Sequence, residues 1–251
     1  MRTLDVERLA EGLWEQSGLF ADAVDGADPD GRVDTCPEWR IRDLVVHLGQ
    51  AHRWAAGVAR TGAPAPAPDP GAADPGGPDA WSGWLRAGAQ ELIEAVGDGG
   101  TVVWTFTGPR PSVFWLRRML HDTSVHQGDA ALALGTAFEI APDLAADAIT
   151  EGLELLTAPG AEAIKSDLAE LRGDGQTLQV LPADGPEGWL ITRTPGGPRW
   201  EHGSSGGDVV VAGPVAGLLL VLTRRLPADG SGARVAGDRA LLDHWLAHTA
   251  M

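Results

Sequence analysis

The stretch Cys36-Pro-Glu-Trp-Arg-Ile-Arg-Asp-Leu-Val-Val-His47 decides the fold, together with a later one, Leu120-His-Asp-Thr-Ser-Val-His126-Gln-Gly-Asp129. Each has apolar residues at the spacing of an amphipathic helix. Asp122 and His126 stand four residues apart, so a helix places their side chains on one face. If the two helices pack together, His47 can join that face. The sequence therefore predicts a divalent-metal site made of His47, Asp122 and His126.

Each of these residues also has an ordinary explanation. Asp122 and His126 are consistent with a local hydrogen bond on one helix, and His47 follows an apolar stretch typical of a core histidine. A helical bundle favours the metal site, because bundle cores build such sites from side chains on facing helices. Asp129 is interpreted equally as an orienter of the His126 imidazole or as a solvent-exposed acid.

Helical periodicity dominates the first half of the chain. Apolar residues recur at helical spacing over 3–25, 39–60, 80–96 and 112–134. These four helices predict an antiparallel four-helix bundle as a first domain, residues 1–140. Thr35 is expected to cap the second helix, with Pro37 at its start. Residues 61–79 contain six prolines, so we expect a long loop there.

The pattern changes after Leu171, where short runs are separated by Gly, Pro and Asp. These runs predict antiparallel strands at 176–181, 188–193, 198–202 and 208–211. Residues 203–207 are interpreted as a hairpin turn. Further helices are expected at 143–156, 214–225 and 239–248. The chain is therefore predicted to be α+β, with a small α+β second domain at 141–251.

Composition and charge exclude several partners. The formal net charge is -16, which repels nucleic-acid phosphates and anionic membranes, so neither is expected as a partner. No apolar run approaches the roughly 18 residues that a membrane span requires, and no signal segment is visible. A cytoplasmic protein is expected.

Cys36 is the only cysteine, which excludes an intrachain disulfide and a cysteine-rich zinc site. Its place near a helix N-terminus favours a thiolate. A small apolar residue that docks the loop is nevertheless the preferred interpretation. His52 comes five residues after His47 and is expected to point elsewhere. No neighbouring residues suggest metal ligation by His202, His244 or His248.

Two segments of the chain resemble the signatures of a known family. The segment from Thr35 to His47 resembles the N-terminal signature of the mycothiol-dependent maleylpyruvate isomerase family. Val125-His-Gln-Gly-Asp-Ala-Ala-Leu-Ala-Leu-Gly135 resembles its second signature. The resemblance implies a DinB-like metal-binding bundle followed by a small sterol-carrier-like domain.

The resemblance also implies a site and a chemistry. Zinc would be held by His47, Asp122 and His126, with Asp122 standing where the family has glutamate. Aspartate is shorter by one methylene, about 1.5 Å. Arg225 matches a second-domain arginine near the active site. The implied cofactor is mycothiol or a similar low-molecular-weight thiol, which zinc would hold as a thiolate. The implied reaction is isomerisation or S-transfer, with an arginine that clamps a substrate carboxylate.

Two other functions stay open from the sequence. The Asp122 departure motivates a non-catalytic binding or regulatory module on the same fold. A metal-dependent hydrolase would need a general base, for which only Asp129 or His121 is evident. The expected partners are a small-molecule substrate and a thiol, and the chain is compatible with a monomer or a homodimer.

Overall fold

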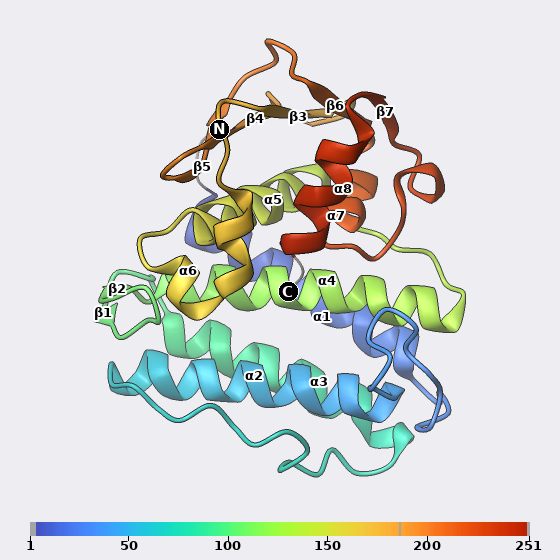
Figure 1. Ribbon diagram of the computed structural model, residues 1–251. Helices are drawn as coiled ribbons and strands as arrows, with labels where there is room; N and C mark the ends of the chain where they lie inside the picture. The colour runs from blue at the N-terminus through green and yellow to red at the C-terminus, as the bar shows by residue number, and fades with distance from the viewer. Residues whose placement is uncertain (1–3, 186, 250–251) are drawn as a thin grey trace. The chain divides into compact units, whose positions relative to one another are not determined.

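The computed structural model describes residues 4–185 and 187–249, which form two compact units (Figure 1). One unit is Leu4–Ile140, and the other contains the described residues from Ala141 onward. The first is a helical bundle and the second is a five-stranded mixed sheet with helices, so the fold is α+β as predicted. Within the described residues, every helix is too short or too polar to span a membrane.

The first unit contains the four predicted helices. They are α1 (Val6–Val24), α2 (Ile41–Thr61), α3 (Pro78–Val96) and α4 (Val113–Leu134), with β1 (Val102–Val103) and β2 (Arg110–Pro111) between α3 and α4. The apolar residues of α2 recur at three- and four-residue spacing, so they share one face that packs into the core. This core includes Phe20, Val24, Ile41, Leu44, Leu48, Trp81 and Leu85.

Helix α2 begins later than the sequence predicted. Thr35 was expected as its cap, but the helix starts at Ile41 and the preceding residues form turns. Trp39 N donates to Cys36 O at 2.8 Å within these turns. Pro37 disfavours the helical conformation for Cys36, the residue before it, which fits the turn there. The turns bring Cys36 and Trp39 close to the bundle core, where both side chains pack.

A glycine allows α2 and α3 to approach closely. A Cβ atom on Gly49 of α2 would overlap the ring of Trp84 on α3. Arg53 closes the contact by donating to Gly49 O at 2.9 Å and to Trp84 O at 2.8 Å. Its guanidinium also lies 4.4 Å from the Trp84 ring centroid. This contact fixes the helix that carries His47.

We expect Gly49→Ala to lower the free energy of unfolding of the bundle by about 1–3 kcal/mol, because the added methyl group displaces the Trp84 ring. Gly57 lies on the same helix with nothing within 4 Å of an added Cβ. Gly57→Ala is therefore expected to be neutral or stabilising by up to about 1 kcal/mol, from helix propensity alone. Urea unfolding measures both, and equal stabilities would contradict the close contact.

The second unit combines helices with one mixed sheet. Its elements are α5 (Pro142–Leu156), α6 (Ala161–Ile164), η1 (Ser166–Leu171), β3 (Thr177–Pro182), β4 (Trp189–Thr194), β5 (Gly197–His202), β6 (Val209–Gly213), α7 (Val215–Leu222), η2 (Ala228–Gly230), β7 (Arg234–Gly237) and α8 (Arg239–His248). The strand order is β5-β4-β3-β6-β7. Helices α5, α7 and α8 lie on one face of this sheet (Figure 1). Trp189 of β4 donates to Thr150 of α5 at 3.0 Å, which ties this helix to the sheet.

The sheet differs from the predicted antiparallel arrangement at one pairing. Strand β6 pairs parallel with β3, and β4 and β3 separate it from β5. The segment 203–207 is therefore a crossover between non-adjacent strands, and the predicted hairpin turn is wrong. Strand β7 was not predicted, because its four residues are mostly exposed and carry no apolar alternation.

Candidate metal centre

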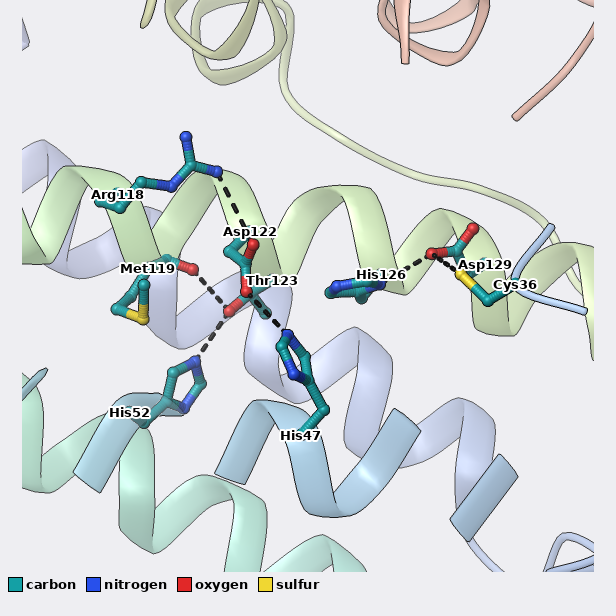
Figure 2. A network of polar contacts seen from close by, with 9 residues as sticks. All are labelled: Cys36, His47, His52, Arg118, Met119, Asp122, Thr123, His126 and Asp129. Atoms are coloured by element: carbon teal, nitrogen blue, oxygen red, sulfur yellow. Dashed lines mark hydrogen bonds and ion pairs between the residues drawn. The ribbon is translucent and has the colours of Figure 1, made fainter. Parts of the chain in front are cut away.

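Three predicted ligands come together inside the bundle unit. His47 on α2 faces Asp122 and His126 on α4, and their ligand atoms all lie within 4.8 Å of one another (Figure 2). His47 Nε2 lies 3.4 Å from Asp122 Oδ2. Two ligands at about 2.1 Å from a tetrahedral zinc are about 3.4 Å apart, so this pair has a suitable separation. The shorter aspartate side chain therefore reaches His47.

Exposure changes stepwise across these three side chains. The exposed fraction is 39% for His47, 27% for Asp122 and 10% for His126. The group thus has one buried side and one accessible side. A cavity of about 660 Å³ adjoins the accessible side and is lined by both His47 and Asp122. An ion held here would have protein ligands behind it and room for a small molecule in front.

A buried carboxylate orients His126. Asp129 Oδ2 lies 2.7 Å from His126 Nδ1, and the Asp129 side chain is fully buried (Figure 2). Because a carboxylate accepts, Nδ1 carries the proton and Nε2 keeps its lone pair for a metal ion. Of the two interpretations of Asp129, the structure supports the orienter and excludes the solvent-exposed acid.

Cys36 lies on the far side of Asp129. Its Sγ is 3.8 Å from Asp129 Oδ2, and Cys36, His126 and Asp129 form a second group with ligand atoms within 4.8 Å. The 2.7 Å separation of His126 Nδ1 and Asp129 Oδ2 is a hydrogen-bond distance, so these two atoms are engaged with each other. Asp129 therefore orients a ligand of the first group, and Cys36 packs against the core, as expected for a docking residue.

The charge state of Asp122 suits metal binding. Burial acts to raise the pKa of Asp122, but the hydrogen bond from His47 and the nearby His126 and Arg118 outweigh it and lower the pKa below its usual value. Arg118 Nη2 lies 3.7 Å from Asp122 Oδ1. Asp122 is therefore a carboxylate at neutral pH, which is the form that coordinates a metal ion.

His52 stays apart from the metal group, as the sequence predicted. Its Nε2 lies 2.8 Å from Thr123 Oγ1, and that hydroxyl donates to Met119 O at 2.7 Å. Because the hydroxyl proton is already used, His52 Nε2–H is the donor and the ring is the Nε2-protonated tautomer. Burial is the main reason that the pKa of His52 falls to about 4.

Aromatic side chains and a proline-rich loop form the walls of the cavity. The aromatic lining residues are Trp39, Trp54, Phe106 and Trp115. The loop of residues 62–77 adds Ala67, Pro68, Pro70 and Gly71. Several hydrogen bonds hold this loop to α2; among them, Trp54 Nε1 donates to Ala65 O at 3.3 Å, and Ala73 N donates to Gln50 Oε1 at 2.9 Å.

The sequence did not reveal this cavity wall. Trp54 and Trp115 stand seven residues from His47 and Asp122 on α2 and α4, and only this spacing signals a shared face. Arg118, four residues before Asp122, gave a similar unused signal. Arg225 lies in the second unit, where its Nη1 donates to Thr223 O at 2.8 Å. Its catalytic role stays a prediction.

The fold and the site define a helical-bundle protein with a candidate metal centre. Residues 10–131 match the family model described as the mycothiol maleylpyruvate isomerase N-terminal domain, and the chain belongs to this family.

Solved structures show the same fold over most of the chain. The crystal structure of the mycothiol-dependent maleylpyruvate isomerase aligns with a TM-score of 0.60 at 17% identity, covering 94% of this chain and 96% of that chain. A histidine-to-alanine mutant of that isomerase aligns with a TM-score of 0.56 at 16% identity, with the same coverage. A ubiquinone synthesis protein aligns with 40% of this chain and 84% of its own, at a TM-score of 0.31. No curated protein sequence matches the chain.

Proposed function

We propose that this protein is a metal-dependent enzyme that uses a mycothiol-type low-molecular-weight thiol for isomerisation or S-transfer on a small carboxylate-bearing substrate. One observation carries the proposal: His47 and Asp122 line a cavity large enough for a small molecule, and an oriented His126 completes their ligand group. Membership of a family named after a mycothiol-dependent isomerase supports the choice of thiol and reaction.

The residues present fit a zinc ion. His47 and His126 supply imidazole nitrogens and Asp122 a carboxylate oxygen, which is the donor set of catalytic zinc sites with open positions. Bound zinc would supply the positive charge that keeps a thiol in its thiolate form at neutral pH. Asp129 keeps His126 in the tautomer that ligates.

The thiol must come from outside the chain. Cys36 is the only cysteine, and it is absent from the described residues that line the cavity. Its sulfur lies against Asp129, behind His126. An external thiol could enter through the cavity, on the accessible side of His47 and Asp122.

The cavity also favours a substrate class. Its aromatic walls offer contact to a planar or apolar body, while Arg118 is the one arginine among its described lining residues, which include no lysine. An arginine binds a carboxylate with two parallel hydrogen bonds, so Arg118 would attract the carboxylate of a substrate. Arg225 is proposed as a further catalytic arginine on the resemblance alone.

The hydrolase alternative receives no support from the site. It needs a general base within reach of bound water, and Asp129 and His121 were its candidates. Neither is among the described residues that line the cavity, and Asp129 is occupied by His126. The binding-module alternative predicts no stoichiometric metal and no rise in Tm with the thiol. One experiment therefore separates it from the enzyme.

The test is calorimetric titration of tag-free, metal-stripped protein with Zn²⁺, wild type beside His126→Ala, followed by thermal unfolding with and without mycothiol. We expect His126→Ala to bind one zinc fewer than wild type, and mycothiol to raise the Tm of zinc-loaded wild type only. Arg225→Gln is expected to keep the metal and lose turnover. Equal zinc binding in wild type and His126→Ala, or no thiol-dependent shift, would contradict the enzyme and favour the binding module.

A further inference from the structure

We propose that Glu170, His244 and His248 form a second divalent-metal site, specific for zinc-like ions and contained within the C-terminal unit. His244 and His248 lie one turn apart on α8, and Glu170 lies on η1, which packs against α8. One ligand atom from each residue lies within 4.8 Å of the others. None of the three belongs to the centre in the bundle unit.

The two imidazoles are arranged to act together. Their ring centroids are 4.3 Å apart with an interplanar angle of 34°, so both rings leave the helix in a similar direction. His248 Nδ1 lies 2.8 Å from His244 O. A carbonyl only accepts, so Nδ1 carries the proton and Nε2 of His248 keeps its lone pair for a metal ion.

His244 has an unused ring nitrogen. Its Nδ1 is buried and has no hydrogen-bond partner among the described residues. A buried nitrogen of this kind is uncommon and costs free energy. An ion coordinated by Nδ1 of His244 would give this nitrogen the partner that the described protein atoms do not provide.

Glu170 is held in place by an arginine from the sheet. Arg193 of β4 donates to the backbone carbonyls of Glu170, Leu171 and Arg172 at 2.8, 3.1 and 2.7 Å. These bonds fix the end of η1, and with it the start of the Glu170 side chain, near α8. The guanidinium charge opposes a cation, and the Glu170 carboxylate offsets that repulsion.

The end of α8 and the donor set both suit a bound cation. His244 and His248 lie near the C-terminal end of α8, where unpaired carbonyls carry partial negative charge. Two imidazoles and one carboxylate form a donor set that suits zinc.

The consequence of this site would be structural. An ion shared by η1 and α8 cross-links the segment before the sheet to the last helix of the chain. Ions that bind only the folded state stabilise it in proportion to their concentration, so zinc should stabilise the C-terminal unit.

The experiment uses the full chain with the bundle centre removed, His47→Ala/His126→Ala, titrated with Zn²⁺ by calorimetry. We expect one equivalent to remain and the Tm to rise with zinc. Adding His248→Ala should abolish both effects, and adding Glu170→Gln, which leaves α8 unchanged, should weaken binding at least tenfold. Adding His202→Ala, which removes another histidine of the same unit, should change neither.

The remaining outcomes of the zinc titrations distinguish the bundle centre from the site in the C-terminal unit. No zinc bound by His47→Ala/His126→Ala, or binding that survives His248→Ala, would overturn the second site. Conversely, if the bundle variant binds as much zinc as wild type and His248→Ala removes it, the second site stands. The centre behind the proposed function then fails.

Discussion

Replacing Asp129 with asparagine is expected to weaken zinc binding at the bundle centre by about 10- to 100-fold, although Asp129 itself is not a proposed ligand. The buried carboxylate holds the proton on His126 Nδ1 at 2.7 Å. An asparagine amide can donate instead, which moves the imidazole proton to Nε2 and blocks coordination, as in a catalytic triad that loses its aspartate.

Competition with a chromophoric chelator measures this affinity, with a circular dichroism spectrum to confirm folding. Glu94→Gln is the matched control, because it removes one negative charge from an exposed position of α3. Cys36→Ala tests the alternative ligand group of Cys36, His126 and Asp129, and should leave the affinity within a few-fold of wild type. A large loss of zinc affinity in Cys36→Ala would show that Cys36 is a ligand. Unchanged zinc affinity in Asp129→Asn would show that Asp129 does not orient His126.

The metal-free bundle is expected to lose about 3 kcal/mol of stability through His52 as the pH falls from 7 to 4. Burial lowers the pKa of His52 from 6.5 to about 4 in the folded state. The unfolded chain therefore binds a proton first. The contribution of neutral His52 is complete above pH 6.5 and is lost as the pH falls towards 4. Protonation would place a charge on Nδ1, which is buried without a partner.

Urea unfolding at a series of pH values, with chelator present, measures the loss. His52→Gln keeps an amide donor for Thr123 and does not titrate, so its stability should depend less on pH by about 3 kcal/mol. Thr123→Val is the control: it should lower stability at every pH, because His52 loses its acceptor, while the acid sensitivity remains. Parallel pH profiles of wild type and His52→Gln would show that another group causes the acid loss.

The two predictions concern histidines of one bundle with opposite roles. His126 has a carboxylate on one ring nitrogen and a cavity near its metal group, so it is prepared to bind an ion. His52 has a hydroxyl on one nitrogen, and its other nitrogen is buried without a hydrogen-bond partner among the described residues, so it favours the neutral, uncoordinated ring. A candidate ligand and a core histidine therefore differ in what surrounds the ring nitrogen that is not hydrogen-bonded.

Local patterns made much of the bundle predictable. The apolar spacing of Leu44, Val45 and Leu48 requires a helix with one buried face, and Asp122 and His126 must share a face of any helix that contains them. The start of α2 was misplaced because proline allows both a helix start and a turn before it. Which alternative wins depends on packing of Cys36 and Trp39 against other helices.

Contacts between distant segments were decided only by the tertiary structure. The parallel pairing of β3 with β6 follows from packing, because strand periodicity carries no information about the partner. The approach of Glu170 to His244 and His248 depends on Arg193, which is far from both in the chain. The sequence by itself determined the helices, the chemistry of their side chains and one shared face. Whether His47 on α2 meets that face of α4 depends on how the helices pack. That packing buries residues far apart in the chain, so no local spacing encodes it.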